Sequence, residues 1–214
     1  MPIMQERVRT QAQKLLAAIV NPVKLVMFTQ EMECPTCREA RQLAEEVASL
    51  SEKLALEIYN LMIDTEKAKE YGVDRVPTLC VVGAKDYGIR FNGIPAGYEF
   101  TSLMNAVKLV SDGDSGLKPE TRKQLAGLAK PVDIQTFVTL TCPYCPVMAF
   151  QAQRMAVESD NVSASVVDSA EFPHLANLYQ VMAVPKTVIN KAHSFEGVVP
   201  EERLIEEIEK ALSA

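Results

Sequence analysis

The segments CPTC, residues 34–37, and CPYC, residues 142–145, decide the fold of this chain, because each places two cysteines three positions apart around a proline. Cysteines with this spacing lie on the same side of the first turn of a helix. Their sulfur atoms are then close enough to bond across about 2 Å. Each segment can therefore switch between a dithiol and a disulfide.

The residues around the two segments repeat as well. The two cysteine pairs are 108 positions apart, and the same offset aligns four further identical residues. With one more residue of offset, Phe28 falls on Phe137, so the match extends upstream of each pair. We interpret this pattern as an internal duplication. The four residues that recur downstream are Tyr71, Val73, Val76 and Pro77, which reappear as Tyr179, Val181, Val184 and Pro185.

Each unit has the same expected order of elements: helix, strand, C-P-x-C, helix, strand, helix, Val-Pro, hairpin, helix. Alternating strands and helices followed by a hairpin indicate an α/β fold with a mixed central sheet flanked by helices, built twice. The longest stretch of turn residues, Ser111–Gly116, lies in the middle of the chain. We therefore expect two tandem domains, residues 1–115 and residues 116–214.

Hydrophobic periodicity gives the expected bounds of these elements. Expected helices cover residues 5–20, a stretch from 34 onward, 65–71, 99–110, 119–129, 143–158, 171–179 and 200–212. Expected strands cover 24–29, 54–63, 78–82, a stretch ending at 91, 132–138, 162–167, 186–189 and 194–198.

Composition narrows the class of protein. The length of 214 residues suits two domains of about 100 residues each. Hydrophobic residues at 48% and charged residues at 23% exclude disordered, collagen-like and disulfide-scaffold chains. A net charge of −6 lacks the broad basic surface that nucleic acid or an anionic membrane attracts, so we expect neither as a partner. No apolar run approaches the roughly 18 residues of a membrane span.

From this we expect a cytoplasmic protein. Cysteines in the cytoplasm stay mostly reduced, so an ordered cysteine pair there indicates catalysis or metal binding. A metal site is the weaker interpretation, because zinc ribbons keep their two pairs about 15 to 20 residues apart. We therefore predict no metal. Cys80, alone in an apolar stretch, is expected to be a buried core thiol. His174 and His193 lack the spacing of metal ligands and are expected at the surface.

The two cysteines of each pair are expected to differ. The first, Cys34 or Cys142, is predicted at the helix N-cap with the following proline at the first helical position. Free backbone N–H groups and the positive end of the helix dipole favour the thiolate there, so this cysteine is the nucleophile. The second, Cys37 or Cys145, is expected one turn inside the helix, more buried and with a higher pKa. That position suits it to resolve a mixed disulfide.

A C-x-x-C at a strand-to-helix turn, followed by Val-Pro before a hairpin, resembles the thioredoxin fold. The CPYC segment resembles the glutaredoxin form of the motif. Two intact pairs in one chain resemble the glutaredoxin-like protein disulfide oxidoreductases of thermophilic bacteria and archaea, and the resemblance covers nearly the whole chain. It implies two tandem thioredoxin-like domains and a protein thiol-disulfide oxidoreductase. It also implies no bound cofactor beyond the redox-active disulfides Cys34–Cys37 and Cys142–Cys145.

The resemblance further implies that the Val76-Pro77 and Val184-Pro185 bonds are cis and face the disulfides. Val76, Pro77, Val184 and Pro185 would then bind an extended substrate segment by a short form of strand addition. Tyr144 adds an aromatic surface beside the second pair.

One feature departs from the thioredoxin pattern. Thioredoxins usually carry a buried acid six positions before the first cysteine, where this chain has Phe28 and Thr136. Proton transfer must then use water or another carboxylate. Glu31 and Glu33 precede Cys34, and a carboxylate beside a thiol opposes its ionisation. We therefore expect the second pair to carry most of the turnover.

Only the resemblance indicates the partners of the protein. It implies protein disulfides or dithiols as substrates and a flavoprotein thioredoxin reductase using NADPH as electron donor. One alternative is a relay to a peroxiredoxin, as in the tandem thioredoxin module of bacterial alkyl-hydroperoxide reductase flavoproteins, although that module normally keeps one C-x-x-C. A different class is a non-redox holdase chaperone. Reduction, formation and exchange of disulfides all remain open as the net reaction.

Overall fold

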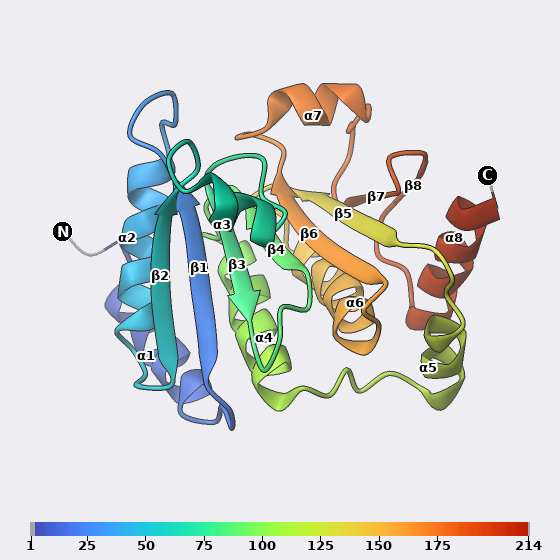
Figure 1. The fold of residues 1–214 in the computed structure, drawn as a ribbon, viewed down its shortest axis with the longest axis horizontal. Helices are drawn as coiled ribbons and strands as arrows, with labels where there is room; N and C mark the ends of the chain where they lie inside the picture. Colours follow the sequence, from blue (N-terminus) through green and yellow to red (C-terminus); the bar gives the residue numbers. More distant parts are fainter. Residues whose placement is uncertain (1–2, 214) are drawn as a thin grey trace.

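The computed structural model describes residues 3–213 and is built around one mixed sheet of eight strands (Figure 1). The strand order across the sheet is β2-β1-β3-β4-β6-β5-β7-β8. The sequence predicted the mixed α/β class correctly, but its two separate sheets are one. The bounds of the strands are β1 Val23–Thr29, β2 Leu54–Asn60, β3 Thr78–Val82, β4 Ile89–Asn92, β5 Val132–Val138, β6 Val162–Asp168, β7 Lys186–Ile189 and β8 His193–Glu196.

The two halves of the chain meet where β4 pairs with β6 in parallel, from Ile89 opposite Ala164 to Asn92 opposite Val167. Each half alone would leave this strand edge unpaired, with a row of free N–H and C=O groups. Joining the edges satisfies those groups, which is why two expected sheets become one.

Helices cover both faces of the sheet. Figure 1 shows α4 and α6 behind the strands, and the two ends of the chain at opposite ends of the sheet. α1 and the helices of the second half, α5 to α8, begin and end within a few residues of their expected bounds. Both α1 and α5 are shorter than predicted. The bounds are α1 Glu6–Leu16, α2 Cys37–Ala48, α3 Thr65–Glu70, α4 Glu99–Asp112, α5 Pro119–Ala126, α6 Cys145–Glu158, α7 Pro173–Leu178 and α8 Glu201–Ser213.

The alternation of side chains along the strands explains why both faces need a cover. In β1, Leu25 and Met27 point into the large core, whereas Val26 and Phe28 belong to a separate cluster on the opposite face. Successive residues of a strand face opposite sides, so a strand that is apolar throughout must be buried twice. In the second half, Phe137 is the counterpart of Phe28 and belongs to a third buried cluster.

Strand direction places both cysteine segments at the same end of the strands. β1 and β4 have the same direction, because each is antiparallel to β3. β4 is parallel to β6, which is parallel to β5. The register also repeats: Phe28 lies opposite Thr78 and Phe137 lies opposite Lys186. Because β1 and β5 point the same way, the segments that follow them emerge on the same side.

Among residues 3–213, no helix combines the length and apolar composition that crossing a membrane requires.

Candidate functional sites

Both cysteine pairs are closed disulfides, as the sequence predicted. The Cα atoms of Cys34 and Cys37 are 5.4 Å apart, and those of Cys142 and Cys145 are 5.5 Å apart. These separations lie in the range that a disulfide spans without moving the backbone. We call the Cys34–Cys37 pair the first site and the Cys142–Cys145 pair the second site.

The helix begins later than predicted at both sites. It starts at the second cysteine, with Thr36 or Tyr144 as the N-cap, rather than at the first cysteine. At the first site, the N–H of Ala40 donates to the carbonyl oxygen of Thr36 at 2.9 Å, so Cys34 and its proline lie in the turn before the helix. The expected placement of Cys34 and Cys142 at the N-cap is therefore wrong.

The helix terminus nevertheless acts on the first cysteine. The backbone N–H of Cys145, the first residue of α6, donates to the Cys142 sulfur at 3.1 Å. A hydrogen bond donated to a sulfur favours a thiolate over a thiol. The thiolate preference of the first cysteine stays a prediction, and this N–H is the group that would provide it.

Burial separates the two cysteines of each pair in the expected order. Cys37 is 2% exposed and Cys145 is fully buried, whereas Cys34 is partly exposed and Cys142 is 7% exposed. A substrate therefore reaches the first cysteine of each pair more readily than the second.

The Val-Pro segments face the sulfur atoms. Both the Val76-Pro77 and the Val184-Pro185 peptide bonds are cis. The carbonyl oxygen of Val184 is 3.8 Å from the Cys142 sulfur. At the first site, Val76 and Pro77 line a cleft with Cys34.

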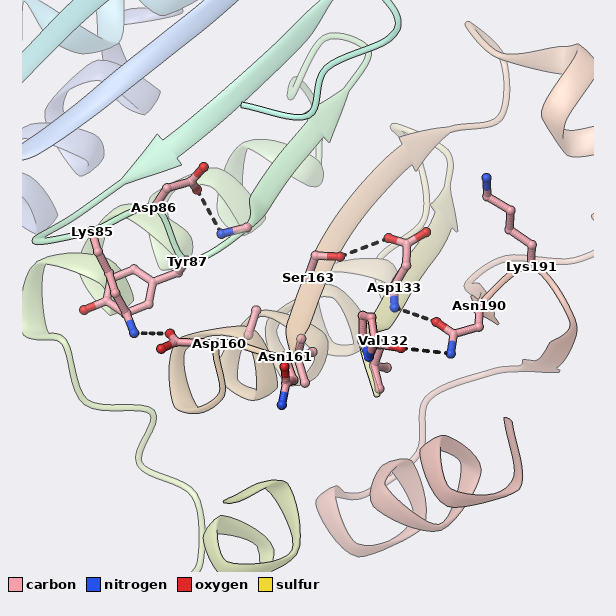
Figure 2. Close-up of a pocket in the computed structure, with 14 residues that line it drawn as sticks. Lys85, Asp86, Tyr87, Val132, Asp133, Asp160, Asn161, Ser163, Asn190 and Lys191 are labelled. Carbon is pink, nitrogen blue, oxygen red and sulfur yellow. Dashed lines mark hydrogen bonds and ion pairs between the residues drawn. The ribbon is translucent and has the colours of Figure 1, made fainter. Parts of the chain in front are cut away.

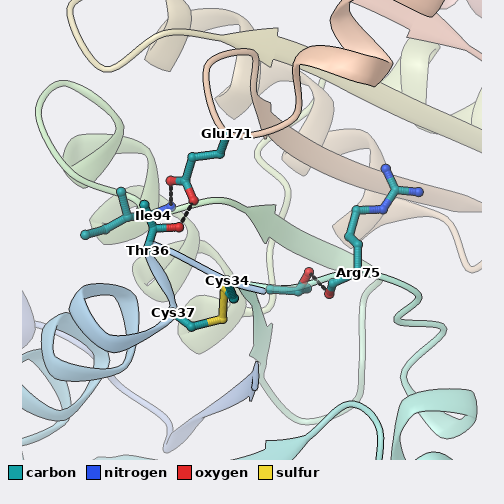
Figure 3. The surroundings of a disulfide bond; sticks show 7 residues. Cys34, Thr36, Cys37, Arg75, Ile94 and Glu171 are labelled. Carbon is teal, nitrogen blue, oxygen red and sulfur yellow. Dashed lines mark hydrogen bonds between the residues drawn. A yellow bond between two sulfur atoms is a disulfide. The ribbon is translucent and has the colours of Figure 1, made fainter. Parts of the chain in front are cut away.

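The first site has a neighbour that the sequence did not predict. Glu171, from the loop between β6 and α7 in the other half of the chain, accepts hydrogen bonds from the Thr36 hydroxyl and from the N–H of Ile94, the latter at 2.6 Å (Figure 3). Glu171 is 135 positions from Thr36, and its counterpart in the repeat is Ile63. No sequence signal links the two, because their contact depends on the pairing of β4 with β6.

The second site has an apolar rim instead. Tyr144 and Val147, which flank Cys145 in the chain, are 67% and 49% exposed, and Met182, two residues before Val184, is 89% exposed. Their counterparts at the first site, Thr36, Glu39 and Asp74, are polar. The two sites therefore present different surfaces to a substrate.

A buried carboxyl lies at the start of the helix that packs against α6. Glu99 opens α4, which packs against α6, and the preceding N–H of Tyr98 donates to the carbonyl oxygen of Leu140 at 3.0 Å. One oxygen of Glu99 accepts from Ser102 at 2.7 Å and the other has no partner within the described residues. Burial raises the pKa of Glu99 to about 7, and the carboxylate of Asp168 adds to the rise.

The sequence did not single out Glu99 either, although helix periodicity places it at the buried start of a helix. The two positions where thioredoxins keep an acid hold Phe28 and Thr136, both fully buried. Glu31 and Glu33 are exposed.

The sequence also predicts the surroundings of the fifth cysteine and of the two histidines. Cys80 is a free, fully buried thiol, and burial raises its pKa to about 12, which makes it a core residue as predicted. His174 is exposed as expected. His193 is not simply a surface residue: it is partly buried and its ring pairs with the buried carboxylate of Glu207. Across residues 3–213, no three His, Cys, Asp or Glu side chains gather as metal ligands would.

The largest cavity described, about 740 Å³, holds no cysteine (Figure 2). It lies at the start of β5 and β6, the end of the sheet away from the disulfides. Lys85 pairs with Asp160, and Asn190 holds the N–H of Asp133 at 2.8 Å. These polar groups are thus engaged with one another, and we place the chemistry at the cysteines.

Known proteins resemble this chain over nearly its whole length. A thioredoxin domain family model matches residues 132–210. The protein disulfide oxidoreductase of Aeropyrum pernix is 31% identical, with a TM-score of 0.92 over 98% of this chain and 94% of that one. The alkylhydroperoxide reductase protein AhpF of Enterococcus faecalis is 30% identical, with a TM-score of 0.88 over 96% of this chain and 99% of the solved chain.

Among curated proteins, an alkyl hydroperoxide reductase component of Pseudomonas aeruginosa is 27% identical over 99% of this chain. The match covers 38% of that protein, and the chain spans roughly a third of the length of the curated relatives it matches. The two C-x-x-C disulfides, at the same end of the strands of a thioredoxin-like sheet, fit the similarity to a protein disulfide oxidoreductase. The chain therefore belongs to the thioredoxin-fold protein disulfide oxidoreductases.

Proposed function

We propose that this protein exchanges disulfides with protein substrates through two redox sites, using Cys34 and Cys142 as nucleophiles and Cys37 and Cys145 as resolving thiols. The observation that carries the proposal is the matched geometry of the two sites. Each has a closed disulfide, a more exposed first cysteine, a buried second cysteine and a cis Val-Pro beside it.

In the reducing direction, the first thiolate attacks one sulfur of a substrate disulfide and displaces the other as a thiolate, which takes up a proton. The resolving thiol loses its proton, attacks the mixed disulfide and releases the second substrate thiol. Two electrons and two protons have then passed from the dithiol to the substrate, and the enzyme pair is a disulfide again. The reverse sequence oxidises a substrate dithiol.

Substrate binding is the role we assign to the Val-Pro segments and to Tyr144. The backbone groups of Val76 and Val184 can pair with an extended segment that Pro77 and Pro185 hold against the sulfurs. The carbonyl oxygen of Val184, 3.8 Å from the Cys142 sulfur, is within reach of the residue next to a reacting cysteine. Tyr144 adds an exposed aromatic ring for apolar contact.

We also propose that the two halves are tandem thioredoxin-like units, residues 1–115 and 116–214, fused along β4 and β6. The repeated strand order and the equal register opposite Phe28 and Phe137 support this division. The loop between α4 and α5 then connects the units.

For partners, we propose a cytoplasmic flavoprotein reductase as electron donor and protein disulfides as acceptors. A peroxiredoxin as acceptor is the second candidate, because the relatives from Pseudomonas and Enterococcus are components of alkyl hydroperoxide reductases. A chaperone that displays thioredoxin folds without redox chemistry is the competing class.

Reduction of insulin disulfides with dithiothreitol tests the proposal. We expect Cys34→Ser and Cys142→Ser each to lose part of the activity, with the larger loss for Cys142→Ser, and the double variant to lose all of it. Activity that survives the double variant contradicts a thiol mechanism. Suppression of insulin aggregation by that same variant would favour the chaperone class.

A further inference from the structure

The cleft beside Cys34 is built from both halves of the chain. Its volume is about 290 Å³. Val76 and Pro77 form one wall, and Ala170, Glu171 and Pro173 from the loop after β6 form the other. A substrate segment held against Val76 therefore also faces residues of the second half.

Glu171 has a fixed position in this wall. One carboxylate oxygen accepts from the N–H of Ile94 at 2.6 Å, and the other accepts from the hydroxyl of Thr36, between the two cysteines (Figure 3). The space behind it is closed, since a Cβ on Gly93 would come within 3.0 Å of its Oε1. The carboxylate is thus held at the cleft rather than turned into solvent.

The charge of the cleft is negative. Glu33 and Glu171 both line it, and none of the described residues that line it is a lysine, an arginine or a histidine. Arg38 and Arg41 line a separate hollow, on the side of Cys34 toward Tyr59 and Asp64. A cationic side chain in the cleft therefore faces two carboxylates, and Arg75, which precedes Val76, is paired with Asp74.

The second site has no equivalent wall. The counterpart of Glu33 is Thr141, and the counterpart of Glu171 is Ile63, which lies beyond β2 at the outer edge of the sheet and is 76% exposed. β8 is the other edge strand in the described residues, so no strand like β6 flanks the second site. Only the first site is shaped by both halves.

We propose that Glu171 determines the specificity of the first site, which selects cysteine-containing protein segments that carry lysine or arginine beside the reacting disulfide. The proposal rests on the proposed function of Cys34 and names its substrate class. Charges at the rim of a binding surface act mainly on the rate of association, and salt weakens them. The chemical step is the same as at the second site: two electrons pass from the reduced Cys34–Cys37 dithiol to the substrate disulfide.

The test uses the full chain with the second site removed by Cys142→Ser and Cys145→Ser. It is reduced in advance, freed of reductant, and mixed with short peptides whose single cysteine carries a neutral fluorescent thiol in disulfide linkage. The peptides are identical except for lysines or glutamates beside the cysteine. We expect the lysine peptide to react about three- to tenfold faster at low ionic strength, the size of effect that one or two rim charges produce.

Three variants in the same background show whether Glu171 is responsible. Glu171→Gln should bring the ratio of the two rates close to one, and Glu171→Asp, which keeps the charge, should retain a preference for lysine. Glu52→Gln removes an exposed charge from the turn before β2, outside the cleft, and should leave the ratio unchanged. A purely structural role of Glu171 would change both rates together, without changing their ratio or its dependence on salt.

The possible results separate the role of Glu171 from the redox function of the first site. Equal rates for the two peptides, or an undiminished preference for lysine in the Glu171→Gln variant, overturn the proposal while leaving the redox function of the first site intact. Failure to reduce either peptide overturns the function of that site itself. Where Glu171→Gln does not fold, the loss of the lysine preference at high salt in the parent protein still separates a charge effect from none.

Discussion

At the residue scale, the N–H of Cys145 matters as much as its sulfur. It donates to the Cys142 sulfur at 3.1 Å, so in the mechanism that we propose the same residue stabilises the attacking thiolate and later resolves the mixed disulfide. Since the Cys145 sulfur is fully buried, it meets the mixed disulfide from inside the protein and does not compete for the substrate. Replacing its sulfur leaves the backbone hydrogen bond in place, which makes the two roles separable.

Cys145→Ser should accumulate a covalent complex with a protein disulfide, because Cys142 still attacks and nothing resolves the product. Cys142→Ser should form none at this site. The complexes are counted on non-reducing gels, in a background that lacks both cysteines of the first site. Equal trapping by the two variants would contradict the assignment of nucleophile and resolving thiol.

Glu99 should make stability fall as pH rises. The unfolded chain ionises this carboxyl near its ordinary pKa of 4.5, whereas the folded protein keeps the proton up to about 7. The folded state therefore binds more protons between these values, and above pH 7 it has lost at most about 3 kcal/mol of unfolding free energy.

Glu99→Gln should remove most of that pH dependence, so the fall in unfolding free energy from pH 5 to pH 8 becomes smaller by about 2 kcal/mol. Urea titrations at the two pH values measure it. Glu120→Gln, at an exposed carboxyl, is the matched control. An unchanged fall in the Glu99→Gln protein would show that this carboxyl is ionised in the fold.

At the element scale, the loop that leads from β4 into α4 supports the second site. Gly97 has φ +56°, and a Cβ there would overlap the carbonyl oxygen of Leu140, two residues before Cys142. The N–H of Tyr98 then fixes the same carbonyl. The first half of the chain thereby holds the backbone that leads into the second cysteine pair.

Gly97→Ala should destabilise the protein by about 1 to 3 kcal/mol and slow the second site, because the new methyl group displaces the segment before Cys142. Gly72→Ala is the control: it also has a positive φ, +62°, but its Cβ meets nothing within 4 Å. Denaturation midpoints and insulin reduction in a Cys34→Ser background measure the two effects. Similar rates for both variants would contradict the support role.

The elements within each half could be predicted from the sequence because their signals are local. The apolar run of β1, the C-P-x-C segment and the Val-Pro before β3 lie close together along the chain, and the repeat doubles each signal. The N-cap of the helix was misplaced by two residues, since proline at an expected first helical position also fits the turn before it. The β4–β6 pairing could not be predicted, because edge hydrogen bonds use backbone groups that every sequence has. Glu171 was missed for that same reason, whereas helix periodicity places Glu99 at a buried position without indicating the partners of its carboxyl.

At the scale of the whole molecule, one core serves both halves. A single cluster of buried side chains includes Leu25 and Leu103 from the first half and Met148, Ala164 and Ile208 from the second. The halves also share the parallel pairing of β4 with β6. Separating them would expose apolar surface and a strand edge together, so neither half gains by unfolding alone.

Thermal unfolding of the oxidised chain should therefore be a single transition in which the calorimetric and van't Hoff enthalpies agree. Differential scanning calorimetry measures both quantities. Two resolved transitions, each with the enthalpy of about half the chain, would show that the units are energetically independent.

The most direct test of the two-site account is the number of disulfides that one pre-reduced chain can reduce in the absence of any other reductant. Because each dithiol carries two electrons, the intact protein should reduce two equivalents of substrate disulfide. Chains with Cys34→Ser and Cys37→Ser, or with Cys142→Ser and Cys145→Ser, should each reduce one, and the chain lacking all four cysteines should reduce none. The count comes from thiols titrated in the separated substrate. One equivalent for the intact protein, with all of it lost on removal of a single pair, would contradict the claim that both sites are redox-active.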